Sequence, residues 1–245
     1  VVPQTGLTIT GAALAAGRVL ALSPALTFYS RYYIQETLLA CFTLAAVIAT
    51  WRYIIERKLI WSTIAAAALA LMFTTKETWV ISVAGLIVAT IVAFRWAVPT
   101  RTDNPNYIVH TVVALMVAGS IWLTLFSSFF TTGQGLIDSF SAYAAYFDRG
   151  NQPTHHQHPW HFYLARLAWH HPGPGPHWTE AFILLSAALG TVASIAKRNR
   201  FGLYITAFTL VVILILSLIR YKTPWNLIQF HVPLCILGGL GLGFI

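Results

Sequence analysis

The segment 220–226, with the sequence RYKTPWN, places two cations between two long apolar runs. Such charges are costly at a membrane boundary unless an anion or water receives them. The planar donor fork of Arg220 and the mobile ammonium of Lys222 together suit a phosphate. The alternative is a pair of basic side chains that extend to the membrane surface beside an aromatic belt. Pro224 and Asn226 favour the phosphate, because a plain hydrophobic turn needs neither of them.

Two further sets of charges lie at the ends of apolar runs. Arg31 and Glu36 flank the start of one run, where the alternative is a helix cap with a basic side chain at the interface. Lys76 and Glu77 lie in a short break between two runs, where the alternative is a hairpin tip exposed to water. Neighbouring residues on a helix do not face each other, so Lys76 and Glu77 are not a simple ion pair. Because the break is short, we expect its charges to close over a pocket shared with Glu36.

The segment 131–177 is far longer than an ordinary connection, and such length usually marks function or disorder. Its first half, 136–147, is rich in Ala, Tyr and Phe, which predicts an amphipathic helix at the membrane interface. Its second half holds His155, His156, His158, His161, His170, His171 and His177. Imidazole suits zinc, so one of these histidines is a candidate ligand of a catalytic metal. The histidines have no cysteine among them, which favours the alternative of a neutral loop that faces substrate or the interface.

The composition identifies the elements that must position these residues. The chain has 245 residues, of which 57% are hydrophobic and only 9% charged, and its mean hydropathy is +0.69. Soluble domains carry about 25% charged residues, so this composition indicates a polytopic membrane protein. The net charge of +8 lies mostly between apolar runs. It therefore indicates membrane topology and contact with anionic lipids, and we expect no nucleic acid partner.

The apolar runs and the charges between them predict a topology. The runs lie at about 7–28, 34–53, 59–74, 79–96, 107–130, 178–196 and 201–218, and an eighth begins near 226. Short basic loops follow the second, fourth and sixth runs, so the positive-inside rule places those loops in the cytoplasm. The four polar sets above then share the extracytoplasmic side. The pattern predicts a single all-α transmembrane domain of about seven to eight helices, with one long extracytoplasmic loop at 131–177.

An ordered set of short motifs resembles a known family. The set begins with Ser23-Pro24, Tyr29-Ser30-Arg31-Tyr32 and Glu36, and continues with Thr75-Lys76-Glu77, His158-Pro159-Trp160 with Tyr163, and the segment 220–226. It is similar to the GT-C membrane glycosyltransferases, in the branch of the protein mannosyltransferases and aminoarabinose transferases. Within that branch it resembles most the archaeal and bacterial group called flippase-activity-associated proteins. The resemblance covers nearly the whole chain.

The resemblance implies an inverting glycosyltransferase in the plasma membrane of an archaeon or bacterium. Such an enzyme transfers sugar from a polyprenyl-phosphate donor to a protein or glycolipid acceptor on the extracytoplasmic face. Its catalytic acidic residue lies in the first external loop, which is expected before Val1. The resemblance places the donor phosphate at Arg220, Lys222 and Arg31, and a divalent metal ligand at His158. It places the sugar pocket at Glu36, Lys76, Glu77, Tyr163, Trp225 and Asn226.

The sequence leaves a second function open. A non-catalytic membrane protein that binds lipid-linked sugars, or assists their translocation, needs the same phosphate site but no general base. A secondary transporter is less favoured, because the chain has no internal repeat and no matched pair of broken helices.

Overall fold

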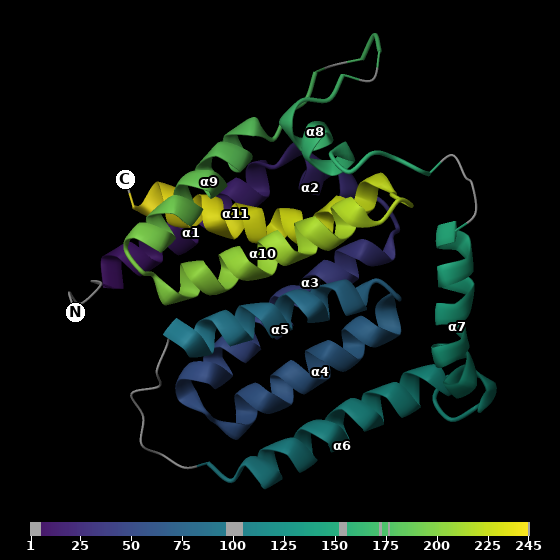
Figure 1. Ribbon diagram of the computed structural model, residues 1–245. Coiled ribbons are helices and arrows are strands. Elements are labelled where there is room, and N and C mark those ends of the chain that lie inside the picture. The colour runs from purple at the N-terminus through teal and green to yellow at the C-terminus, as the bar shows by residue number, and fades with distance from the viewer. Residues whose placement is uncertain (1–5, 97–104, 152–155, 172, 176, 245) are drawn as a thin grey trace.

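The computed structural model describes residues 6–96, 105–151, 156–171, 173–175 and 177–244 (Figure 1). Within these ranges the regular structure is helical, with no strand beyond two isolated bridges. The helices are α1 (Gly6–Leu22), α2 (Pro24–Tyr29), α3 (Gln35–Glu56), α4 (Leu59–Thr75), α5 (Trp79–Trp96), α6 (Tyr107–Phe126), α7 (Gln134–Asn151), α8 (Phe162–Ala168), α9 (Ala181–Ala196), α10 (Arg200–Leu218), the 3-10 helix η1 (Pro224–Leu227) and α11 (Ile228–Gly243). The predicted all-α fold is confirmed.

Several helices have the length and composition to cross a membrane. Four of them are long and apolar enough: α3, α6, α10 and the continuous stretch Pro224–Gly243 formed by η1 and α11. Shorter apolar helices lie at Gly11–Leu22, Leu59–Thr75, Trp79–Arg95 and Ala181–Ala196. At 1.5 Å per residue, a helix of 17 residues such as α4 is about 25 Å long. The chain thus has the character of an integral membrane protein, and the count of seven to eight spans stays a prediction.

The first apolar run is divided at Pro24, because proline breaks a continuous helix. α1 ends at Leu22, and Ser23 becomes the N-terminal cap of α2. The Ser23 hydroxyl accepts a hydrogen bond from the backbone amide of Leu26 at 3.1 Å, and Pro24 occupies the first turn, where its missing amide hydrogen costs nothing. The result is a short helix set beyond the end of α1, on the side to which the positive-inside rule assigns the polar sets.

The long segment 131–177 contains two helices. The amphipathic helix expected at 136–147 lies within α7, whereas its place at the membrane interface stays a prediction. The sequence did not predict α8, which follows Pro159 by one short turn. Figure 1 shows α7 standing at a steep angle to α6, beside the end of that helix. In the same view α8 lies near the start of α11.

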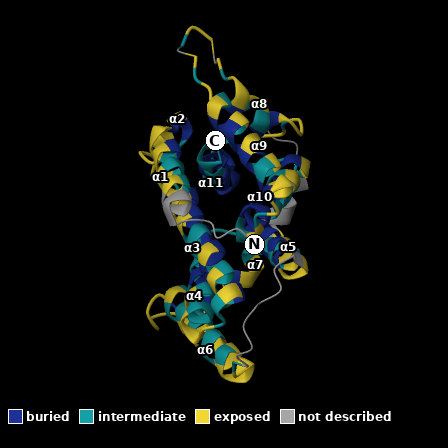
Figure 2. Cartoon of the chain, turned by 90° about the vertical axis from the view of Figure 1, so that its left-hand side faces the viewer, coloured by how far each residue is buried: buried dark blue, intermediate teal, exposed yellow. Residues whose placement is uncertain are grey.

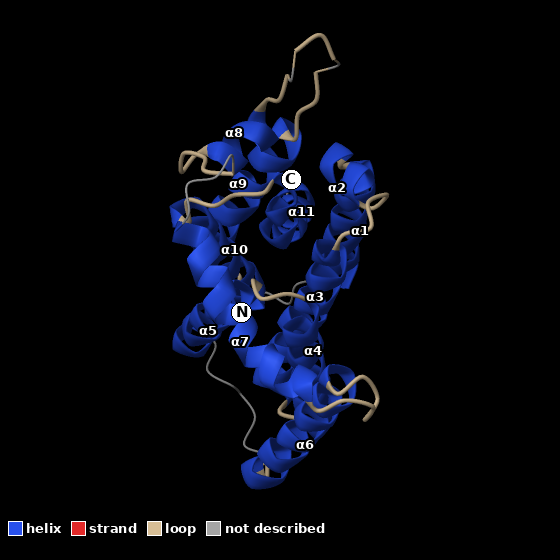
Figure 3. Cartoon of the chain, turned by 90° about the vertical axis from the view of Figure 1, so that its right-hand side faces the viewer, coloured by secondary structure: helices blue, strands red, loops and turns tan. Residues whose placement is uncertain are grey.

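α11 lies between α1 and α9, and glycines permit the close contact. Figures 2 and 3 show α1 and α9 on opposite sides of α11. A Cβ atom at Gly239 would overlap the backbone of Ala16 on α1, and one at Gly190 on α9 would overlap the carbonyl of Leu237 on α11. Backbones can approach this closely only where side chains are absent, and small residues are common at helix contacts in membranes for that reason.

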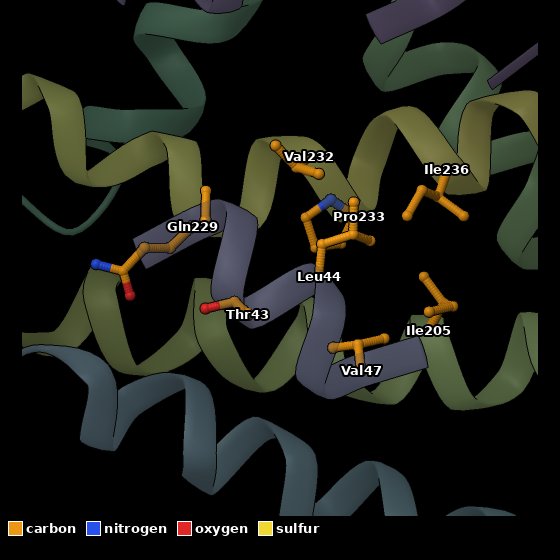
Figure 4. Close-up of a pocket in the computed structure, with 9 residues that line it drawn as sticks. Thr43, Leu44, Val47, Ile205, Gln229, Val232, Pro233 and Ile236 are labelled. Atoms are coloured by element: carbon orange, nitrogen blue, oxygen red, sulfur yellow. The ribbon is translucent and has the colours of Figure 1, made fainter. Parts of the chain in front are cut away.

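A small gap remains among α3, α10 and α11 (Figure 4). It has a volume of about 10 Å³ and is lined mainly by apolar side chains, with Thr43 and Gln229 at its polar edge. Pro233 also lines the gap and has no amide hydrogen, so the Gln229 carbonyl loses its usual partner within α11. This volume is at the lower limit for holding one water molecule, so the gap is too small for a substrate.

The glycine contact predicts that a Gly→Ala substitution changes stability differently at two positions. We expect Gly239→Ala to lower stability by about 1–3 kcal/mol, because the added methyl forces α1 away from α11. Gly119 on α6 has open space around it, so Gly119→Ala should be neutral or stabilise by up to about 1 kcal/mol. Thermal unfolding of the purified protein in detergent measures both. Equal stability of the two variants would contradict the packing described here.

Candidate functional site

The segment 220–226 forms the turn between α10 and α11, and its two cations differ in exposure. Arg220 is exposed, whereas Lys222 is 1% exposed. The Lys222 ammonium donates to the carbonyl of Ile219, which is the C-terminal cap of α10. This bond satisfies a carbonyl that the helix leaves without a donor, and the charge complements the helix dipole. Burial lowers the pKa of Lys222. Of the two cations, Arg220 is therefore the one that presents its charge at the surface.

The histidine-rich segment lies directly against this turn. Gln157 pairs with Tyr221 in an isolated antiparallel bridge. The His158 amide donates to the Arg220 carbonyl at 3.1 Å, and the Lys222 amide donates to the His156 carbonyl at 2.8 Å. The structure thus brings together two polar sets that the sequence places on one side of the membrane.

Arg166 on α8 joins this group, and the sequence analysis missed it. Its guanidinium carbon lies 4.6 Å from the ring centre of Phe162, and the His158 ring stacks on Phe162 with centres 4.0 Å apart. Burial lowers the pKa of His158, and the nearby charges of Arg166 and Lys222 lower it further. We name Arg166, Arg220, Lys222, His156 and His158 the cationic cluster.

The candidate metal ligand His158 has no partners for coordination in the described part of the chain. Within the described ranges, no group of three His, Cys, Asp or Glu side chains could hold a metal ion. The His158 ring instead packs face to face on Phe162. His155 lies outside the described residues. The donor set described does not fit a metal centre, so no step below depends on a metal, and the ligand role of His158 stays a prediction.

Glu36 and Lys76 form a buried ion pair, while the pocket that they are expected to share stays a prediction. Glu36 lies in the first turn of α3 and is 2% exposed. It contacts the ammonium of Lys76, the C-terminal cap of α4. The pKa of Lys76 is lowered to about 8, because the effect of burial outweighs the opposing effect of the Glu77 charge. The contacting Glu36 carboxylate also favours the charged ammonium, so we regard the pair as ionised at neutral pH.

The start of α11 connects the ion pair with the cationic cluster. Gln229 donates through its side-chain amide to the Thr78 hydroxyl at 3.0 Å, which fixes the turn after Lys76 against α11. One turn earlier, Asn226 is buried, and its side-chain oxygen has no hydrogen-bond partner among the described residues. A buried acceptor without a donor is uncommon and calls for an explanation. Asn226 is therefore the member of the predicted sugar pocket with unused hydrogen-bonding capacity.

The remaining predicted site residues have varied environments. Tyr163 is buried in α8 and packs edge to face on Phe230 of α11, with ring centres 5.9 Å apart. Its ring therefore holds α8 against α11. Trp225 and Glu77 are partly buried. Arg31 is exposed in the turn after α2. The charge of Arg166 acts on Tyr29 of α2, where it opposes the rise in pKa that burial causes, so the end of α2 lies near α8.

A second buried polar group joins α2, α9 and α11, and sequence patterns did not reveal it. The Ser23 hydroxyl donates to the Glu180 carboxylate at 2.8 Å and lies 2.9 Å from Nε2 of His231. The Ala25 amide also donates to Glu180, at 2.6 Å. Burial raises the pKa of Glu180, but bonds from His231, Ala25 and Ser23 lower it by more.

The three side chains do not have the arrangement of a nucleophilic triad. In such a triad the serine and the carboxylate lie at different nitrogens of the imidazole. Here Ser23 and Glu180 both approach Nε2 of His231, and Nδ1 is buried without a partner among the described residues. All three side chains are at most 2% exposed. The group therefore caps α2 and fixes it to α9 and α11.

Comparison with known proteins adds no assignment. No family model, curated protein or solved structure matches the chain. The site's own residues must therefore support any proposed function.

The buried ion pair yields a stability prediction. Lys76→Met leaves the Glu36 charge buried without a cation and should cost about 3–5 kcal/mol. Adding Glu36→Gln should restore part of that loss, because the uncompensated charge is gone. Thermal unfolding of the purified protein measures both variants.

A matched control uses the other end of α3. Lys58 forms an ion pair with Glu56, but the Lys58 side chain is 58% exposed. Lys58→Met should therefore cost at most about 1 kcal/mol. The buried ion pair is contradicted if Lys76→Met is as stable as Lys58→Met.

Proposed function

We propose that the protein is a membrane glycosyltransferase that takes sugar from a polyprenyl-phosphate donor on the extracytoplasmic face. The observation that supports this most is the cationic cluster at one end of an apolar helical bundle. Arg166, Arg220 and Lys222 gather there, beside two histidines. Positive charge concentrated at a membrane boundary suits an anionic lipid headgroup, and phosphate is the common anionic group of lipids.

Arg220 is the proposed phosphate ligand. It is exposed, and its planar donor fork matches phosphate oxygens. As the glycosidic bond breaks, negative charge grows on the leaving phosphate, and fixed cations stabilise that charge. Lys222 contributes by holding the end of α10 and thus the position of Arg220. Arg166 lies on α8, and Arg31 follows α2, whose Tyr29 senses the charge of Arg166. In this proposal the two arginines complete the positive surround.

The sugar pocket is proposed between the cationic cluster and the Glu36–Lys76 pair. Sugar hydroxyls both donate and accept hydrogen bonds, so carboxylates and amides suit them. A hydroxyl that reaches Asn226 would supply the donor that its side-chain oxygen lacks. Glu77 and Trp225 are partly buried at this end of the bundle, and an indole face packs well against a sugar ring.

The general base is not assigned to a residue of this chain. Glu36 is held by Lys76, and Glu180 by Ser23 and His231, so each has a structural partner. The same phosphate site fits the alternative, a non-catalytic protein that binds or assists translocation of lipid-linked sugars. A transfer assay with a panel of polyprenyl-phosphate sugars and protein or glycolipid acceptors separates the two, because only the enzyme releases polyprenyl phosphate. The proposed location is the plasma membrane of an archaeon or bacterium.

The phosphate role of Arg220 can be tested by donor binding in lipid nanodiscs. Arg220→Gln removes a charged donor, which is worth about 1.5–3 kcal/mol, so donor affinity should fall by roughly tenfold or more. Because Arg220 is exposed, the fold should be retained. Lys222→Gln should weaken binding as well, but with lower thermal stability, since Lys222 is buried.

Arg200→Gln is the matched control. Arg200 is the first residue of α10 and is also exposed, at the opposite end of the same helix. Its variant should bind the donor like the parent protein. Unchanged affinity in Arg220→Gln, or an equal loss in Arg200→Gln, would rule out the proposed phosphate ligand.

A further inference from the structure

A second candidate site is a groove between α1 and α9, whose lining contains no residue of the cationic cluster. The groove has a volume of about 500 Å³, within the range of small-molecule sites. Ala15 and Leu22 of α1 form one wall, Phe182 of α9 lies on the other, and Leu242 of α11 also lines it. Figure 2 shows how α11 lies between the two flanking helices. Leu22 is 78% and Phe182 64% exposed, so the groove opens sideways toward the surrounding medium.

One cation lies in this mostly apolar groove. Arg18 lines it and is exposed, about one helical turn before α1 ends. Within the described ranges Arg18 has no ion pair and no side-chain hydrogen bond. An unpaired charge inside an apolar helix is costly in a membrane and marks a functional position by default. Arg18 lies about 6 Å along the helix axis from the end of α1. A long arginine side chain can span that distance and reach the lipid headgroups.

The carboxylate that also lines the groove is already engaged. Glu180 accepts hydrogen bonds from Ser23 and Ala25, and its oxygen lies 3.6 Å from Nε2 of His231. It is 2% exposed, so its charge faces the protein more than the groove. The charge that the groove presents to a ligand is therefore that of Arg18.

We propose that this groove binds a membrane lipid with a phosphate headgroup. The phosphate accepts hydrogen bonds from the Arg18 guanidinium, and an acyl chain lies along the apolar walls. From Ala15 to Leu22 the α1 wall is about 10 Å long, which accommodates the upper part of one chain. Arginine forms bidentate bonds with phosphate, which accounts for this residue in an apolar helix. The site is separate from the proposed transfer activity and does not depend on it.

Native mass spectrometry of the purified protein, titrated with phosphatidylglycerol, tests the site. Arg18→Gln should weaken binding of one lipid about five- to tenfold, the effect of one cation near a lipid surface. Ala15→Phe should do the same by filling the groove while leaving the charge in place. Leu14→Phe is the control, because Leu14 is 57% exposed on the same helix and does not line the groove.

Two further arms identify the ligand chemistry. Phosphatidylcholine, whose phosphate is balanced by an ammonium, should bind more weakly than phosphatidylglycerol. Inorganic phosphate should not displace the lipid, because it lacks the acyl chain. If it does displace the lipid, the proposal of a lipid site is wrong and the groove binds a free anion. Binding unchanged by both Arg18→Gln and Ala15→Phe, or weakened equally by Leu14→Phe, would overturn the site. Donor binding should persist in Arg18→Gln, so failure here is distinct from failure of the proposed transferase.

Discussion

The close contact of α1 and α9 with α11 is the constraint on which the rest of the structure depends. Glycines on α11 and α9 remove the side chains that would hold the helices apart. With the backbones this near, Ser23 at the end of α1, Glu180 at the start of α9 and His231 on α11 meet and satisfy most of each other's hydrogen bonds. In an apolar solvent these polar atoms cannot form hydrogen bonds with water and must form them within the protein. The close helix packing and the Ser23–Glu180–His231 group therefore stabilise each other.

The same helix organises the proposed site. η1 carries Asn226 and the start of α11 carries Gln229, and Gln229 fixes the turn that holds Lys76 against Glu36. Immediately before α11, the 220–226 segment pairs with the histidine-rich segment and lies near Arg166. A lipid phosphate that binds Arg220 would thus be held by a rigid frame, and fixed charges stabilise a developing charge at little reorganisation cost.

Much of the architecture follows from sequence patterns, because each pattern reports a local property. Apolar runs predicted most of the helices to within a few residues, although the run at 7–28 proves to hold both α1 and α2. The sequence also led us to expect Lys76 near Glu36, because the break is short, whereas the ion pair itself was not predicted. Whether these helices cross the membrane at the predicted count stays a prediction.

Other features depend on tertiary contacts that no local pattern encodes. The contrast between exposed Arg220 and buried Lys222 arises from the helix end that Lys222 caps. Arg166 lies in a seven-residue helix within a segment interpreted as a loop. Glu180 and His231 are far apart in the sequence and match no motif. Arg18 was missed because the sequence does not show whether a charge in an apolar run is paired, and only the structure shows the groove beside it.

The central claim is that the polar end of the bundle faces the outside, and cysteine labelling in intact cells tests it most directly. Single cysteines at Tyr33 and Lys58 lie exposed at opposite ends of α3. Exposed Cys41 is replaced by serine, and buried Cys235 is left in place. The account predicts that an impermeant maleimide labels Tyr33→Cys in intact cells, and Lys58→Cys only after permeabilisation. The reverse pattern would place the cationic cluster in the cytoplasm and contradict the account.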